Sequence, residues 1–99
     1  AAASDAERGI VAIASLISTD RRRLLASPKV GPASYRLFEM LPMMPRFTIE
    51  QGRKNLETSF PTATAAVKTL EDLGIVSEQT GNKKNRSYSY HAYVELLAR

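Results

Sequence analysis

Two helix-start signals and one helix-stop signal follow one another in the second half of this 99-residue chain. Thr48 and Gln51 have the spacing of a capping box, in which each side chain accepts a hydrogen bond from the other residue's backbone N–H. Ser59 is a preferred N-cap residue, and Pro61 follows it where a missing backbone N–H has no cost. Gly74 is typical of the residue just after a helix. This order predicts two short helices joined by a tight turn, which is a helix-turn-helix.

The residues after this unit predict a β-hairpin. Residues 75–80 and 86–90 form two strand-like segments, joined by a five-residue turn that contains Gly81. Tyr88 and Tyr90 alternate with serines, so we expect both tyrosines to face the core. The predicted fold class is therefore mainly α, of the α+β type: a winged helix-turn-helix with a small hairpin wing and an extra N-terminal helix.

Apolar residues at helical spacing predict three further helices, at residues 4–25, 33–41 and 91–98. In the first, the expected apolar stripe consists of Ile10, Ile13, Ile17 and Leu24. Residues 27–32 contain two prolines and a glycine, which end this helix. The predicted division is an N-terminal helix with its linker, residues 1–32, followed by a winged-helix domain, residues 33–99.

The inward-facing residues of the other helices also follow from the spacing. In the helix over 33–41 they are Leu37, Phe38 and Leu41, and in the third helix they are Ala63, Ala66, Val67, Leu70 and Leu73. The expected buried positions of the second helix are Ile49, Gly52 and Leu56. We expect another helix to approach Gly52 so closely that no side chain fits there.

The opposite face of the third helix is the first candidate nucleic-acid surface. It offers Thr62, Thr64, Ala65, Lys68 and Thr69. The DNA major groove admits an α-helix, in which threonine contacts phosphate or a thymine methyl and lysine contacts phosphate or guanine. No Arg, Asn or Gln is present for bidentate base recognition, so strong sequence specificity is not expected. The alternative interpretation is an ordinary solvated helix face.

The wing is the second candidate surface. Lys83, Lys84 and Arg86 place three positive charges and no acid at the hairpin turn, a density that favours phosphate contacts. The alternative is a polar hairpin tip whose lysines keep an edge strand soluble. Arg53 and Lys54 on the second helix are weaker candidates for phosphate contact.

Two other groups of residues have an ordinary structural interpretation and a functional alternative. Arg21, Arg22 and Arg23 end the first helix, where cations interact favourably with the helix dipole, and a binding role is the alternative. Met40, Met43 and Met44 lie near a helix end, where they either fill an irregular gap or form a partner-binding surface.

The composition argues against catalysis. The chain has one histidine and no cysteine, so a metal site would have few ligands other than carboxylates, and a histidine-activated nucleophile is equally unsupported. We expect no enzymatic activity, catalytic residue, metal or cofactor. The apolar run over 10–17 is far shorter than the ~20 residues that cross a bilayer, so no membrane partner is expected. The lack of cysteine favours a cytoplasmic location, and the net charge of +4 is compatible with a polyanionic partner.

Three segments, residues 41–49, 60–70 and 73–90, also carry a family resemblance. In the last, Gly-Asn-Lys-Lys-Asn-Arg is followed by Tyr-x-Tyr and then by a terminal helix with Tyr93 and Leu97. Together they resemble the C-terminal winged-helix domain of Fic (filamentation induced by cAMP) family proteins. The resemblance implies an accessory domain behind an upstream catalytic domain that transfers AMP to a hydroxyl. None of that family's catalytic motif is in this chain.

Two classes of function follow from these observations. In the first, the chain is an accessory module that binds double-stranded DNA through the third helix and the wing. In the second, it is a protein-interaction or regulatory module that does not bind DNA. A small stand-alone transcriptional regulator is a variant of the first. Homodimerisation through the first helix is compatible with each, and a palindromic DNA site requires it.

Overall fold

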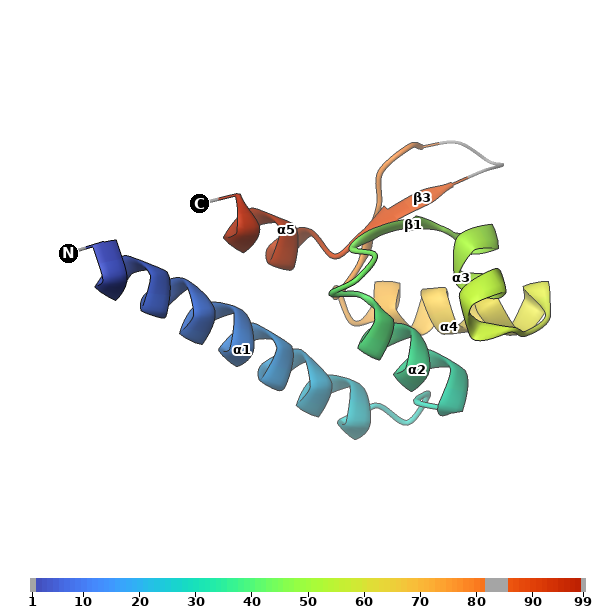
Figure 1. Cartoon of the computed structure of the whole chain (residues 1–99). Helices are drawn as coiled ribbons and strands as arrows, with labels where there is room; N and C mark the ends of the chain where they lie inside the picture. Colours follow the sequence, from blue (N-terminus) through green and yellow to red (C-terminus); the bar gives the residue numbers. More distant parts are fainter. Residues whose placement is uncertain (1, 82–85, 99) are drawn as a thin grey trace.

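A computed structural model describes residues 2–81 and 86–98 of the chain, and for residues 2–8 the backbone alone. The elements in chain order are α1 (Ala2–Ala26), α2 (Pro32–Met40), β1 (Arg46–Thr48), α3 (Ile49–Leu56), α4 (Phe60–Asp72), β2 (Ser77–Glu78), β3 (Ser87–Ser89) and α5 (His91–Leu97). Figure 1 shows α2, α3 and α4 gathered beside a small sheet, with α1 as a long helix that contacts α2 and α5. The mainly helical, winged-helix-like α+β fold predicted from the sequence is confirmed.

The sheet has three antiparallel strands in the order β1-β3-β2. Phe47 of β1 pairs with Tyr88 of β3, and Ser77 of β2 pairs with Ser89 on the other side of β3. The central strand therefore joins the segment before α3 to the hairpin after α4. This pairing fixes the hairpin beside the helix-turn-helix.

The first hairpin strand is shorter than the sequence predicts, because the residues just before Ser77 form the end of α4 instead of a strand. Gly74 has a positive φ of 74° and donates its N–H to the carbonyl oxygen of Glu71 at 2.9 Å. Ile75 donates its N–H to the carbonyl oxygen of Leu70 at 3.0 Å. These two bonds form a Schellman motif, which commits Gly74 and Ile75 to ending the helix. The strand begins only at Ser77.

The capping signals read from the sequence are present. Thr48 Oγ1 accepts from the N–H of Gln51 at 3.1 Å, and Gln51 Oε1 accepts from the N–H of Thr48 at 2.8 Å. Ser59 Oγ accepts from the N–H of Thr62 at 3.3 Å at the start of α4. Between the two helices, Glu57 adopts a left-handed conformation with φ 53°, which turns the chain sharply. The turn between α3 and α4 is thus set by local hydrogen bonds.

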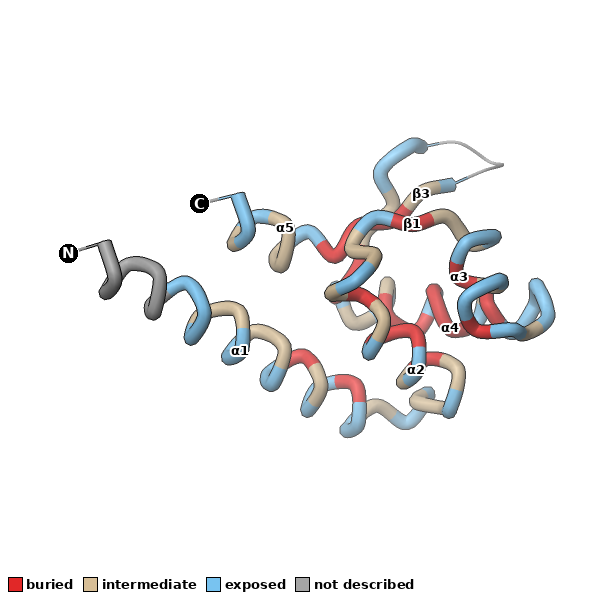
Figure 2. The backbone as a smooth tube through the Cα atoms, in the orientation of Figure 1, coloured by how far each residue is buried: buried red, intermediate tan, exposed pale blue. Residues whose placement is uncertain are grey.

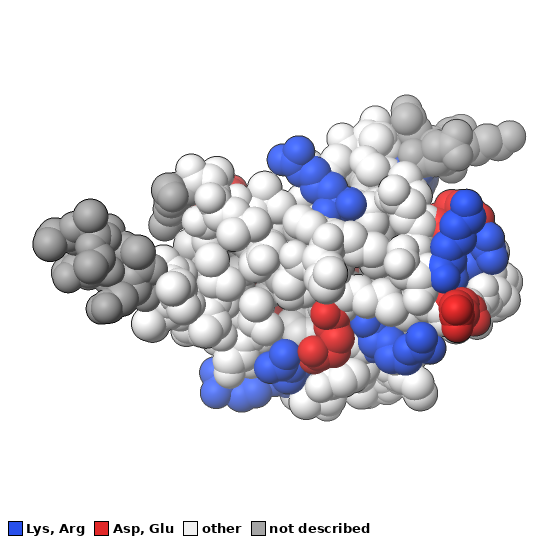
Figure 3. All heavy atoms as spheres, in the orientation of Figure 1, with Lys and Arg blue, Asp and Glu red and all other residues white. Residues whose placement is uncertain are grey.

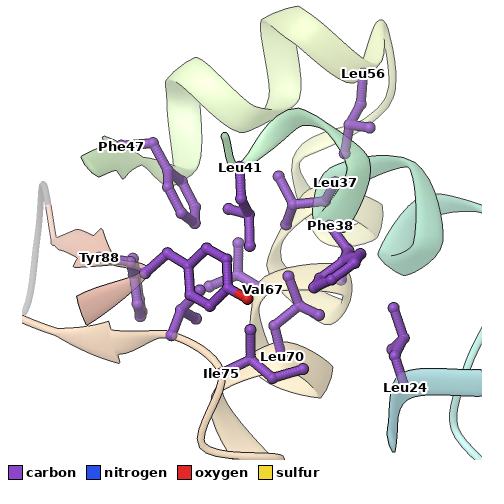
Figure 4. Packing of buried hydrophobic residues seen from close by; sticks show 13 residues of the cluster. Leu24, Leu37, Phe38, Leu41, Phe47, Leu56, Val67, Leu70, Ile75 and Tyr88 are labelled. Carbon is purple, nitrogen blue, oxygen red and sulfur yellow. The ribbon is translucent and has the colours of Figure 1, made fainter. Parts of the chain in front are cut away.

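The core lies between α2, α3, α4 and the sheet, as the buried segments of Figure 2 show. Its buried cluster consists of Leu24, Leu37, Phe38, Leu41, Phe47, Leu56, Ala66, Val67, Leu70, Ile75, Val76, Tyr88 and Tyr90. Figure 4 shows side chains of this cluster converging from the helices and from the face of the sheet that carries Phe47 and Tyr88. Leu24 of α1 belongs to the same cluster. The predicted inward positions on α2 and α4 are confirmed, with Leu73 only half-buried.

Two packing predictions are wrong. Ile10 is 69% exposed, so the buried stripe of α1 does not reach it, and Leu16 packs against the core although it was not predicted to. A Cβ added at Gly52 would lie 3.7 Å from Leu37 Cδ1, which is an ordinary van der Waals contact. Side chains rather than a helix backbone lie beside Gly52, and they leave room for a methyl group.

Polar contacts fix the C-terminal half of α1 to the rest of the fold. Tyr90 donates its hydroxyl hydrogen to Asp20 Oδ2 at 2.7 Å, and both residues are buried. Arg23 donates to Asp20 Oδ1 at 3.0 Å and also to the carbonyl oxygen of Leu73. Arg21 pairs with Glu39 of α2 at 3.0 Å, and this hydrogen bond raises the pKa of Arg21. Two of the three arginines therefore hold α1 to other elements, besides lying near the negative end of its dipole.

Candidate nucleic-acid interface

The outer side of α4 is exposed at three of the five predicted positions. Thr62, Ala65 and Lys68 are exposed, while Ala66 and Val67 on the opposite side belong to the core. Phe60, the first residue of α4, is 54% exposed, although it was not predicted as a site residue. The helix thus presents a hydroxyl, apolar groups and one cation on a face that the core holds in place.

The two other threonines of this candidate surface differ from their prediction. Thr69 is only 9% exposed, and its hydroxyl donates to the carbonyl oxygen of Ala65 at 3.0 Å. It follows Ala66 by three positions and precedes Leu70, so it lies at the edge of the buried side; the prediction that it faces outward is wrong. Thr64 is half-buried, and its Oγ1 is buried without a hydrogen-bond partner among the described residues. Thr62 remains an accessible threonine.

Lys68 is exposed but has an acidic neighbour. Its Nζ lies 3.6 Å from Asp72 Oδ1, one helical turn away, and its side chain is 68% exposed. Lys29 approaches the other oxygen of the same carboxylate at 3.7 Å with 70% exposure. Exposed ion pairs of this kind contribute about 0–1 kcal/mol. A phosphate can therefore take the place of Asp72 beside Lys68 at little cost.

At the wing, Lys83 and Lys84 lie outside the described residues. Arg86 is the first residue described after them. Arg86 is exposed, and its Nε is 3.9 Å from Glu78 Oε1. Glu78 Oε2 also accepts hydrogen bonds from the backbone N–H groups of Thr80 and Gly81. These bonds, that of Gly81 above all, lower the pKa of Glu78. The sequence did not single out Glu78, because the hydrogen bonds that it accepts depend on the backbone conformation of the turn.

The cations of α3 are less available than their sequence suggests. Arg53 donates from Nε to Glu50 Oε2 at 2.9 Å, a bond that raises the pKa of Arg53 and lowers that of Glu50. Lys54 is exposed. Figure 3 shows basic and acidic side chains side by side over this region, with uncharged surface between the charged groups. The face in view is a mixed surface and not a continuous basic field.

The three methionines divide between the two interpretations that the sequence left open. Met40 and Met44 are half-buried and pack against the core, as gap-filling residues do. Met43 is 91% exposed. Together with Glu39, Arg46, Gln51 and Asn55, the methionines line a groove of about 440 Å³. One methionine is therefore available to a partner.

No metal-binding cluster and no membrane-spanning helix accompanies this surface in the described part of the chain. Among the side chains of residues 9–81 and 86–98, no group of three or more His, Cys, Asp and Glu lies close enough to hold a metal ion. His91 Nδ1 lies 3.3 Å from Ser77 Oγ at the start of α5. No helix in the described part of the chain has the length and apolarity to span a membrane. No protein-family model and no curated protein matches the chain, so the Fic resemblance stays a prediction.

Proposed function

We propose that the chain is an accessory winged-helix module that binds double-stranded DNA, with α4 in the major groove and the wing on the neighbouring backbone. One observation carries this proposal: the outer side of α4 exposes Thr62, Ala65 and Lys68, and no acidic residue precedes Glu71 on that helix. The opposite side is buried, so the exposed side chains are held on a rigid element. The major groove accommodates a helix of this kind.

The chemistry of this face suits weakly specific binding. Thr62 Oγ1 accepts a hydrogen bond from Ser59 Oγ at 2.9 Å, which leaves its own hydroxyl hydrogen for a phosphate or base acceptor. The Ala65 methyl group and the exposed ring of Phe60 are suited to thymine methyl contacts. Since α4 contains no Arg, Asn or Gln, most of the affinity would come from phosphate contacts and would fall as salt increases.

The biological setting is proposed from the resemblance to Fic proteins. The module would belong to a cytoplasmic protein with an upstream Fic catalytic domain, and would itself carry no catalysis, metal or cofactor. A small stand-alone transcriptional regulator would use the same DNA-binding surface. The presence or absence of a Fic motif in the same open reading frame distinguishes these two settings.

The test is a titration of fluorescent duplex DNA at about 50 mM and about 200 mM salt. The informative variant is Lys68→Ala, and Lys29→Ala is its matched control. Both lysines contact Asp72, with side chains 68% and 70% exposed, so the two variants lose the same charge and the same ion-pair partner. Only Lys68 lies on α4. We expect Lys68→Ala to weaken binding about five- to tenfold and to reduce the salt slope by about one, and Lys29→Ala to have little effect.

The wing is tested in the same titration by replacing Lys83, Lys84 and Arg86 together with alanine. Three lost phosphate contacts would reduce the salt slope by about 2 to 3. Equal weakening by Lys68→Ala and Lys29→Ala would indicate a general charge effect and would contradict docking of α4. An unchanged slope in the wing variant would remove the wing from the model.

A protein-interaction module is the second candidate, and the exposed Met43 favours it. This side chain is 91% exposed and lines a groove together with Met40 and Met44 and four polar or charged residues. Flexible methionine surfaces adapt to apolar partners. Absence of DNA binding even at about 50 mM salt would favour this function over the first.

A further inference from the structure

The N-terminal half of α1 presents an uncovered face. Ile10 is 69% exposed and Val11 66% exposed, and Ala14, Ser15 and Ser18 are exposed beyond them. The sequence has no charged residue between Arg8 and Asp20. Surface helices usually carry charged residues on their solvent side. Isoleucine, valine, serine and glycine are also weak helix formers, so this half of α1 depends on packing for its stability.

We infer that this face pairs with the same face of a second copy of the chain, with the two α1 helices antiparallel. A two-fold axis beside Ala14 brings Ile10 against the partner's Ser18, because the two residues lie at equal distances on either side of position 14. Large side chains at one end of the face then meet small side chains from the other end. An interface of this kind is self-complementary, as a two-fold dimer requires.

The charges at the two ends of the uncharged stretch favour the antiparallel direction. Before it, the sequence has Asp5, Glu7 and Arg8, with a net charge of −1 from two acids and one base. After it come Asp20 and the three arginines 21–23, and Glu39 of α2 pairs with Arg21, so this end has a net charge of +1 from three bases and two acids. An antiparallel pair places ends of opposite sign together. A parallel pair would place ends of like sign together, and its helix dipoles would repel.

The size of the face sets the expected strength. Exposed positions of α1 from Gly9 to Leu25 span about 25 Å at about 1.5 Å per residue, and a helix face is about 10 Å wide. This face is much smaller than the ~800 Å² per partner of a standard interface. We therefore expect a weak dimer, with a dissociation constant in the micromolar range or above.

This inference goes beyond the proposed function and does not depend on it. Figure 1 places the free end of α1 at the opposite end of the molecule from α3 and α4. Pairing through α1 thus leaves the exposed side of α4 uncovered. The tests below contain no DNA, so they fail or succeed separately from the DNA titration.

Single cysteines test the register directly, because the chain contains no cysteine. Ala14→Cys should form a disulfide-linked dimer under mild oxidation, since the two cysteines would meet at the axis within the ~7 Å Cα separation that a disulfide spans. Ser18→Cys is the matched control on the same face. Its two copies would lie about 12 Å apart along the helix axis and should not cross-link. A mixture of Ile10→Cys and Ser18→Cys should give the mixed dimer.

Sedimentation equilibrium from about 10 µM to about 1 mM tests association without a cross-link. Val11→Glu should raise the dimer dissociation constant at least about tenfold, because it buries an unpaired charge. Its circular dichroism should match that of the parent, since Val11 is exposed in the single chain. The inference is overturned if Ala14→Cys cross-links no faster than Ala65→Cys on α4, or as slowly as Ser18→Cys. A chain that stays monomeric at the highest concentration also overturns it.

Discussion

The buried hydrogen bond from Tyr90 to Asp20 joins residues that are seventy positions apart, and it offers the clearest test of how α1 is held. Tyr90→Phe removes the hydroxyl and keeps the ring. Phe38 and Tyr93 pack against that ring with centroid distances of 6.2 and 5.6 Å, so the apolar packing is retained. The change is therefore close to the deletion of one hydrogen bond.

The size of the effect follows from the acceptor. Asp20 is only 5% exposed, and after the substitution its carboxylate keeps Arg23 but has no replacement for the hydroxyl. A hydrogen bond to a charged group contributes about 1.5–3 kcal/mol. We expect Tyr90→Phe to lower the free energy of unfolding by about 2 kcal/mol. For a domain of this size the melting temperature should fall by roughly 8–16 °C.

The assay is urea unfolding followed by far-ultraviolet circular dichroism, with Tyr93→Phe as the matched control. Tyr93 also packs in this region, but its hydroxyl lies 3.5 Å from the carbonyl oxygen of Pro42, at the limit of a hydrogen bond. Its loss should cost less than about 0.5 kcal/mol. A double-mutant cycle with Asp20→Ala should give a coupling energy of about 1.5–3 kcal/mol between Asp20 and Tyr90. Equal losses in the two tyrosine variants, or a coupling energy near zero, would refute the reasoning.

Three further outcomes are expected in the same unfolding assay. Thr64→Val should leave stability unchanged or raise it by up to about 1 kcal/mol, because a methyl group replaces a buried hydroxyl without a partner. Gly52→Ala should stabilise α3 by about 0.5–1 kcal/mol, whereas Gly74→Ala should destabilise by about 1–2 kcal/mol because φ is 74° there. Burial, with the hydrogen bond to Asp20, raises the pKa of Tyr90, so the unfolded state ionises first and stability falls above pH ~10. The fall should be about 1.4 kcal/mol larger at pH 11 in the parent chain than in Tyr90→Phe.

The order of the elements could be predicted because each one carries its own local signals. Thr48 with Gln51, and Ser59 at the next start, mark the two helices of the helix-turn-helix. Gly74 marks the end of the second. These signals depend on residues three or four positions apart, and the structure keeps all of them. Local hydrogen bonds and the tertiary fold agree here, which is the situation in which sequence patterns are reliable.

The contacts that hold α1 could not be predicted in the same way. Asp20 was not singled out, because a single aspartate in an amphipathic helix has no pattern that marks it as buried. Its burial depends on Tyr90, which only the packing of the sheet brings near. Gly52 gives the opposite error, since a glycine in a helix suggested a close helix contact and the structure has side chains there instead. Predictions failed where the burial or the free space of a residue depends on which element, distant in the sequence, packs against it.

The candidate surface was predicted in outline but not in its charge balance. Lys68, Arg86 and Arg53 were each predicted as candidates for phosphate contact, and each lies within 4 Å of a carboxylate on its own or a neighbouring element. Asp72 is the last residue of α4 and Glu78 is the last residue of β2. The positive charge on offer to a phosphate is therefore smaller than a count of lysines and arginines indicates.

The proposed DNA binding and the proposed α1 dimer together predict how affinity depends on the length of the DNA. One module with few phosphate contacts has low affinity at physiological salt. Two modules linked through α1 bind a long duplex with a high effective concentration for the second contact, while a duplex that spans one module gains nothing. Val11→Glu should therefore weaken binding to a long duplex and leave binding to a short one unchanged. Equal effects on both duplexes would mean that α1 influences α4 within a single chain, and no effect on either would mean that the two surfaces act independently.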